Sequence, residues 1–244
     1  MAASTEINCS DSSFVVPPPR LVPTIHKTPY PSLLPFRPEL NQSGRTILIT
    51  GGSAGIGFAI AQAYAEASAS NIILTGRRSD VLHQASSKLS GEFPKVKIIP
   101  RVCNVASAEE VARLWSSLGD DGIFVDVLVL NAAKFGQQQQ PLLEADLGET
   151  WSLYETNVKS ILDFCQRLHK QPGADHKKKH IVYVSTAAIH LPSIAAALPS
   201  YSLSKMSGHL LVQKIAEEVD REKLQIVSFH PGQILSETAR SAGP

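Results

Sequence analysis

The sequence has 244 residues, of which 43% are hydrophobic and 18% charged, and its formal net charge is +1. This balance is typical of a globular protein and excludes strong electrostatic steering toward nucleic acid or an anionic membrane. No apolar run approaches the roughly 20 residues of a membrane span, and the N-terminus lacks the basic start and apolar core of a secretory signal. The widely spaced cysteines Cys9, Cys103 and Cys165 form no metal-binding or disulfide pattern, so we predict a cytoplasmic protein.

The first 43 residues differ from the rest of the chain, because they hold eight of its sixteen prolines. Proline removes an amide donor and fixes φ, so neither a regular helix nor a central strand is expected there. We predict a proline-rich N-terminal arm over residues 1–43 and a second domain over 44–244. The stretch "PPPR" is either a polyproline ligand for another protein or part of a plain linker.

From Arg45 onward, short apolar runs alternate with longer helical patterns. The runs are continuously apolar, as in strands buried on both faces, and they cover residues 46–50, 71–75, 95–102, 125–132, 180–185 and 224–229. The helical patterns cover residues 55–68, 79–89, 107–118, 153–170 and 201–220. This alternation predicts a three-layer, doubly wound parallel sheet, the Rossmann fold.

The first predicted strand leads into a glycine-rich turn, "TGGSAGIG", and then into a helix. In such a unit Gly51 permits the sharp turn, Gly55 lets the backbone approach a ligand, and Gly57 lets the helix pack closely on the strand. Backbone amides and a helix N-terminus then meet a pyrophosphate. A purely structural turn is the alternative.

Two arginines, Arg77 and Arg78, follow the second predicted strand. A guanidinium binds a 2′-phosphate in bidentate fashion, whereas an acid would suit a ribose with free hydroxyls. The pair therefore predicts NADP(H) rather than NAD(H) as the cofactor. The alternative is that both arginines belong to a solvated loop.

Tyr201 and Lys205, in "YSLSK", lie four residues apart, so a helix would place them one turn apart on the same face. By itself this spacing is also that of an ordinary polar helix surface. A neighbouring ammonium favours the phenolate, so the pair is a candidate for proton transfer.

Six motifs in order resemble those of the classical short-chain dehydrogenases/reductases: "TGGSAGIG", "LNAA", "ETNVKS", "VSTAAIH", "YSLSK" and "HPG". The resemblance covers about residues 28–244, and "YPSLLPFRPELNQSGRTILITGG" is similar to the lead-in of a fungal branch. It implies a catalytic group of four residues. Tyr201 is the general acid/base, Lys205 assists it, Ser185 binds the substrate oxygen, and Asn157 holds a water of a proton relay.

The resemblance also implies a set of cofactor-binding residues. We expect no metal site, because the cysteines have no metal-binding spacing. The cofactor-binding set is Gly51, Ser53, Gly55, Ile56, Gly57, Arg77, Arg78, Asn104, Asn131, Tyr201, Lys205, Pro231, Gly232, Ile234 and Ser236.

Three features depart from the family pattern. Asn104 stands where an aspartate by the adenine is usual, so we expect a weaker adenine contact. The spacing between Ser185 and Tyr201 is a few residues longer than is usual in the family. The extra length, within residues 189–200, forms either a longer apolar loop along the substrate cleft or an insertion without functional effect. The chain also ends just after the sixth predicted strand, so we expect either a fragment or a shortened product, without the final strand and substrate lid.

These observations predict an NADP(H)-dependent oxidoreductase that acts on a small, apolar carbonyl or alcohol substrate, in secondary metabolism. The alternative is a shortened, weakly active or inactive protein for dinucleotide binding or interaction. We expect neither nucleic acid nor membrane as a partner. By the resemblance, a homo-oligomer would form through the helices that hold Asn157 and Tyr201.

Overall fold

The computed structural model describes residues 30–136 and 140–232. Two predicted cofactor residues, Ile234 and Ser236, and most of the predicted arm lie outside this part of the chain. The chain divides after Leu33 into two units, and the larger one, from Leu34 onward, holds the sheet and every other predicted site residue. The domain boundary predicted at residue 43 stays a prediction.

Within the described residues, a six-stranded parallel sheet has the order β3-β2-β1-β4-β5-β6. This confirms the predicted Rossmann fold. The strands are β1 (Thr46–Ile49), β2 (Asn71–Gly76), β3 (Lys97–Val102), β4 (Val127–Leu130), β5 (Lys179–Val184) and β6 (Leu224–Phe229). All four residues of β1 and all four of β4 are buried, because helices cover both faces of the sheet at its centre.

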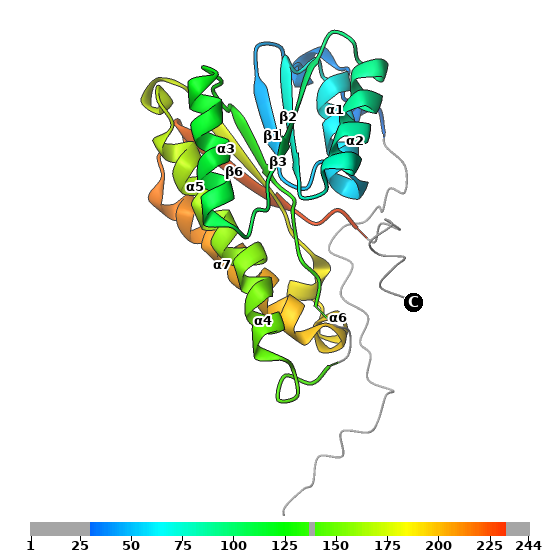
Figure 1. The fold of residues 1–244 in the computed structure, drawn as a ribbon, viewed down its shortest axis with the longest axis vertical. Helices are drawn as coiled ribbons and strands as arrows, with labels where there is room; N and C mark the ends of the chain where they lie inside the picture. The colour runs from blue at the N-terminus through cyan, green and yellow to red at the C-terminus, as the bar shows by residue number, and fades with distance from the viewer. Residues whose placement is uncertain (1–29, 137–139, 233–244) are drawn as a thin grey trace, which may run out of the picture. The chain divides into compact units, whose positions relative to one another are not determined.

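In Figure 1, α1 and α2 lie on one side of the sheet, and α3, α5 and α7 lie on the other. Each side buries its own apolar cluster against the strands. The helices are α1 (Gly55–Glu66), α2 (Ser79–Glu92), α3 (Ala108–Asp120), α4 (Leu147–Tyr154), α5 (Ser160–Lys170), α6 (Pro192–Ala197) and α7 (Pro199–Glu218). Within the described residues, no helix is both long and apolar enough to cross a bilayer.

Two predicted elements differ from the structure. The single helix expected over 153–170 is interrupted by a π-helical turn, η3 (Glu155–Lys159), which joins α4 to α5. Such turns insert extra backbone into a helix and often lie at functional sites. The segment 189–200 is not a loop throughout, since it contains α6, where three alanines follow a proline at the first helical position.

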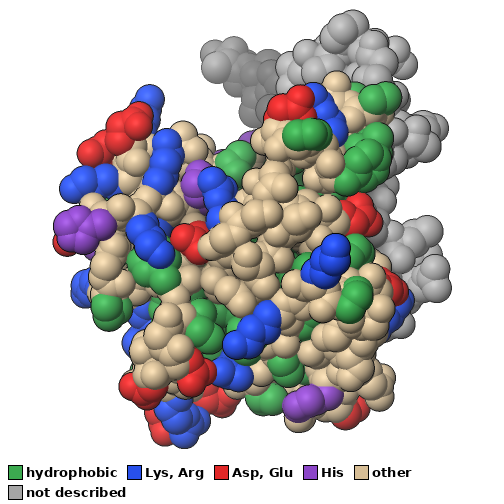
Figure 2. All heavy atoms as spheres, turned by 90° about the horizontal axis from the view of Figure 1, so that it is seen from above, with side chains coloured by type: hydrophobic (Ala, Val, Ile, Leu, Met, Phe, Trp, Pro, Cys, Tyr) green, Lys and Arg blue, Asp and Glu red, His purple; other side chains and the backbone are tan. Residues whose placement is uncertain are grey.

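The strand order reverses direction between β1 and β4, which are neighbours in the sheet although two strands separate them in sequence. In doubly wound sheets, ligands bind beyond the carboxyl ends of the strands at this switch point. On the face drawn in Figure 2, basic and acidic side chains of the described residues are interspersed, as expected from a net charge of +1.

Candidate active site

The glycine turn after β1 has the geometry of a phosphate cradle. Gly51 and Gly55 adopt positive φ values of 65° and 52°, which residues with a Cβ rarely adopt. A Cβ on Gly57 would lie 2.2 Å from the Gly51 carbonyl oxygen, so only glycine lets α1 start this close to the turn. Ala54, the residue before α1, makes no side-chain bond to the first helical amides. The open end of α1 therefore fits a pyrophosphate group.

Asn131 braces this turn from the end of β4. Its Nδ2 donates to the carbonyl oxygens of Thr50 and Gly51, at 3.0 and 3.1 Å. The Thr50 hydroxyl in turn accepts from the backbone amides of Asn131 and Ala132, each at 3.0 Å. Asn131 thus lies at the predicted cofactor site, and its side chain supports the turn.

The adenosine end of the predicted site lies beyond β2 and β3. Arg77 and Arg78 directly follow β2, and both side chains are exposed. The Ser53 hydroxyl lies 3.0 Å from where a Cβ of Gly76 would be, so the glycine turn and the end of β2 are adjacent. The Asn104 side chain accepts from the amide of Ala106, at 3.3 Å. Its acceptor oxygen, expected to face adenine, therefore already has a partner.

Tyr201 lies in the first turn of α7, with only 5% of its surface exposed. Burial raises the pKa of this phenol to about 12, and a hydrogen bond with the Thr186 hydroxyl opposes the rise. Thr186 Oγ1 also accepts from the amide of Ala188, at 3.2 Å, which fixes the side chain next to Tyr201. The phenol is therefore protonated at neutral pH.

Lys205, one turn further along α7, is also buried, with 4% of its surface exposed. Its Nζ donates to the Val184 carbonyl oxygen at 2.9 Å and lies 4.4 Å from the centre of the Tyr183 ring. Burial lowers the pKa of the ammonium to about 8. We expected Lys205 to lower the pKa of Tyr201; in this structure burial dominates and that pKa is raised.

Asn157 lies in the π-helical turn, where it is 1% exposed and ties two segments together. Its side chain accepts from the Lys134 amide at 2.8 Å and donates to the Lys134 carbonyl oxygen at 2.9 Å. Nδ2 also donates to Ser204 Oγ, at 2.9 Å, and Ser204 donates to the Tyr201 carbonyl oxygen at 2.8 Å. Asn157 therefore links the segment that follows β4 to the start of α7.

Ser185 follows β5, and its amide donates to the Phe229 carbonyl oxygen at 2.8 Å. Its Oγ is buried and has no hydrogen-bond partner within the described residues. Pro231 and Gly232 follow β6, the neighbour of β5, and Gly232 has a φ of 87°. The structure thus brings these loop residues to the same edge of the sheet as Tyr201.

Sequence reasoning missed two residues of this site. The Thr186 hydroxyl, rather than that of Ser185, meets Tyr201. A Cβ on Gly208 would lie 2.4 Å from the Asn157 carbonyl oxygen, so this glycine lets α7 cross the π-helical turn closely. The sequence shows Thr186 directly after Ser185, so this hydroxyl could have been found from the sequence. The contact of Gly208 with Asn157 joins residues 51 positions apart, so no local sequence pattern indicates it.

Comparisons with known proteins agree with this geometry. Residues 45–244 match the model of a family described as short chain dehydrogenase. The short chain dehydrogenase/reductase AacuD of Aspergillus aculeatus is 31% identical over 194 residues, covering 80% of this chain and 65% of the relative. One from Claviceps purpurea is 30% identical over 200 residues, covering 81% and 65%. The chain thus spans about 65% of the length of these curated relatives.

Solved structures show the same fold. The L-sorbose reductase of Gluconobacter frateurii, in complex with NADPH and L-sorbose, has a TM-score of 0.74 at 26% identity, covering 81% of this chain and 73% of that one. The NADP complex of RhlG from Pseudomonas aeruginosa has a TM-score of 0.73 at 25% identity, covering 84% and 78%. Fold, motif order and family match agree, and the chain belongs to the short chain dehydrogenase family.

Proposed function

We propose that the protein is an NADP(H)-dependent oxidoreductase that transfers a hydride between the nicotinamide and a small carbonyl or alcohol substrate. The observation that carries this proposal is the burial of Tyr201 and Lys205 one helical turn apart, with Thr186 hydrogen-bonded to the phenol. An ordinary solvated helix face would leave both polar groups in water, because their burial is unfavourable. Perturbed, buried titratable groups at the edge of the sheet favour a chemical role.

The residues present fit the cofactor. The open N-terminus of α1, which Gly57 allows to start close to Gly51, suits the pyrophosphate. The exposed guanidinium groups of Arg77 and Arg78 suit a 2′-phosphate, which supports NADP(H) over NAD(H). When bound, the nicotinamide supplies or accepts the hydride, and Lys205 and the Pro231–Gly232 loop would hold its end.

Tyr201 is the proton donor in the reductive direction. As a protonated phenol at neutral pH, it gives its proton to the carbonyl oxygen of the substrate while that carbon receives the hydride. In the oxidative direction the phenolate takes the proton of the alcohol, so the rate rises with pH. Asn157 holds the start of α7 against the segment that follows β4. Its part in a proton relay stays a prediction.

We assign to Thr186, rather than to Ser185, the hydroxyl group that binds the substrate oxygen. Thr186 is partly exposed and contacts the Tyr201 phenol, whereas the Ser185 Oγ is inaccessible. A donor that stabilises charge on a substrate oxygen contributes about 10²–10³-fold to the rate. Thr186→Ala should therefore lower kcat by about that factor, and Ser185→Ala should have a much smaller effect. If Ser185→Ala instead lowers kcat more than Thr186→Ala, the hydroxyl that binds the substrate oxygen is that of Ser185.

The test of the proposed function is NADPH titration followed by NADPH oxidation with a panel of ketones and aldehydes. We expect NADPH binding, turnover with at least one carbonyl compound, and a loss of turnover of about 10²-fold or more in Tyr201→Phe. If NADPH binds while no carbonyl compound is reduced and Tyr201→Phe changes nothing, the protein is a dinucleotide-binding protein. The cytoplasmic location and the role in secondary metabolism stay predictions.

We also propose a homo-oligomer that forms through α5 and α7. Leu203, Met206 and Leu210 form an exposed apolar stripe along α7, and Leu162 of α5 is exposed as well. Apolar side chains at this spacing share one helix face, and contiguous apolar surface marks interaction sites. Analytical ultracentrifugation should detect an oligomer that Leu210→Lys weakens, and a monomer at micromolar concentration would contradict this proposal.

A further inference from the structure

A phenylalanine that sequence reasoning did not single out lies against Tyr201. The Phe135 ring stacks on the Tyr201 ring, with centroids 4.5 Å apart and an angle of 19° between the planes. Offset, near-parallel stacking at this distance is a favourable aromatic arrangement. Phe135 is 47% exposed, whereas Tyr201 is 5% exposed. One side of Phe135 therefore shields the reacting phenol, while much of the rest is open to a ligand.

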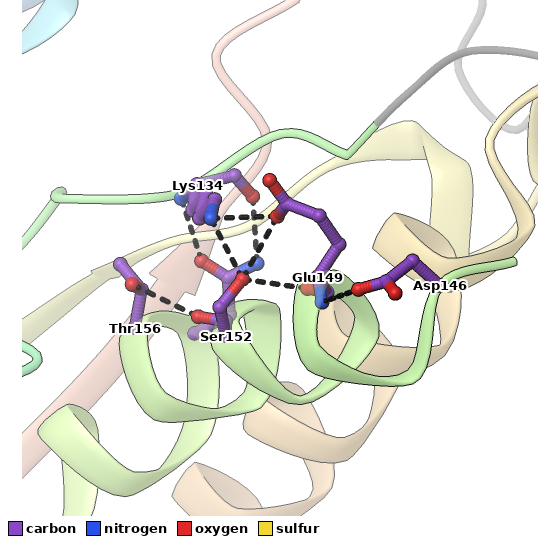
Figure 3. A network of polar contacts seen from close by, with 6 residues as sticks. Lys134, Asp146, Glu149, Ser152 and Thr156 are labelled. Atoms are coloured by element: carbon purple, nitrogen blue, oxygen red, sulfur yellow. Dashed lines mark hydrogen bonds and ion pairs between the residues drawn. The ribbon is translucent and has the colours of Figure 1, made fainter.

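The segment around Phe135 is held in place on both sides. Asn157 makes two hydrogen bonds to the backbone of Lys134, the preceding residue. The Lys134 ammonium donates to Glu149 Oε2 and to Ser152 Oγ, each at 2.7 Å, and Figure 3 shows these contacts converging at the start of α4. On the other side, a Cβ on Gly136 would lie 3.1 Å from a methyl group of Leu153.

The polar network itself is well supported. Asp146 caps α4 by accepting from the Glu149 amide at 2.7 Å, as Figure 3 also shows. Hydrogen bonds from Lys134 and Ser152 lower the pKa of Glu149. The carboxylate is therefore ionised at neutral pH and holds the Lys134 side chain against α4. The residues before and after Phe135 therefore both lie close to α4.

We propose that Phe135 is a specificity-determining residue that contacts the substrate next to its reacting carbonyl and favours flat, conjugated groups such as an aryl ring. This inference rests on the proposed function, because it concerns the substrate of the same site. An exposed aromatic face stacks on a flat ring. It offers no hydrogen-bond partner to a polyhydroxylated chain, whose hydroxyl groups would lose contacts with water.

The test compares two ketones of similar size, acetophenone and cyclohexyl methyl ketone, which differ in whether the ring is flat. The variants are Phe135→Leu, which keeps apolar bulk, and Phe135→Tyr, which keeps the aromatic ring. The matched control is Phe36→Leu, the same change at an exposed phenylalanine in the segment before β1. In Phe135→Leu we expect the ratio of kcat/KM for acetophenone to that for cyclohexyl methyl ketone to fall roughly 3- to 10-fold. Phe135→Tyr and Phe36→Leu should retain the parent ratio.

Two further measurements separate this inference from the proposed function. Equilibrium titration of each ketone into the protein saturated with NADP⁺ measures how much more tightly acetophenone binds than cyclohexyl methyl ketone, even if no turnover occurs. Phe135→Leu should lose the preference for acetophenone there too. In the oxidative direction, Phe135→Ala should move the pH midpoint of kcat/KM downward, because water then reaches Tyr201. A purely structural role would leave this midpoint unchanged.

The outcomes are distinct. Turnover with an unchanged ketone ratio in Phe135→Leu overturns the role of Phe135 and leaves the proposed function intact. Absence of turnover together with preferential binding of acetophenone that Phe135→Leu abolishes overturns the proposed function alone. Binding of neither ketone by the parent overturns the role of Phe135 as well.

Discussion

Gly208→Ala tests the close crossing that positions the candidate active site. A Cβ at Gly208 would lie 2.4 Å from the backbone oxygen of Asn157, well below the 3.0 Å that real Cβ contacts respect. It would also lie 3.1 Å from Ile161 Cδ1 and from the Tyr183 hydroxyl. Because the nearest atom belongs to the backbone, no side-chain rotation relieves the overlap. The π-helical turn or α7 itself must move.

Two opposing effects set the size of the change. Overpacking of a tight contact destabilises a protein by about 1–3 kcal/mol, while replacing glycine by alanine inside a helix contributes about 1 kcal/mol of stability. We therefore expect Gly208→Ala to lower the free energy of unfolding by up to about 2 kcal/mol. The control is Gly119→Ala near the end of α3, where a Cβ meets nothing within 4 Å. This variant should be neutral or stabilised by about 0.5–1 kcal/mol.

The assay is urea unfolding of both variants beside the parent, with thermal melts as a second measure. The two variants should differ by about 2 kcal/mol, or by roughly 4–8 °C in Tm for a chain of this length. The kcat of Gly208→Ala should fall as well, since Asn157 holds the segment next to Tyr201. A Gly208→Ala protein as stable as Gly119→Ala would falsify the packing described for α7 and the π-helical turn.

Three other predictions concern charge and burial. Arg77→Asp should weaken NADPH binding about 10-fold or more and leave NADH binding nearly unchanged, and equal effects in fluorescence titrations would contradict the assignment of NADP(H). For Lys205 the pKa in the folded protein, about 8, lies below the ordinary 10.5, so folding disfavours the ammonium by roughly 3 kcal/mol at pH 7. Lys205→Met should therefore unfold at a higher urea concentration than the parent at pH 7. This difference in urea midpoint should narrow as the pH rises from 8 to 10, and a difference that stays constant with pH would argue against the buried charge. Cys103 and Cys165 are buried thiols whose pKa is raised to about 12, so they should react with a disulfide reagent only after unfolding, and fast reaction of either in the native protein would contradict its burial.

Local patterns in the sequence were sufficient to predict the sheet. Strands buried on both faces must be apolar throughout, so the runs at 46–50 and 224–229 predicted β1 and β6 to within a residue. The glycine turn was equally readable, because positive φ at Gly51 and Gly55 and the close approach at Gly57 each require glycine. These features depend on residues that are neighbours in the chain.

Other features depend on contacts between residues far apart in the chain, and no local pattern reports them. The π-helical turn lies where α7 crosses it closely, with Gly208 against Asn157. The hydroxyl that hydrogen-bonds to Tyr201 is that of Thr186. The spacing of Tyr201 and Lys205 was known from the sequence, but their burial was not. Burial decides the protonation of both groups, because removal of water disfavours the charged form of each. The stack of Phe135 on Tyr201 likewise joins residues 66 positions apart, in a region where α4 and α7 pack together.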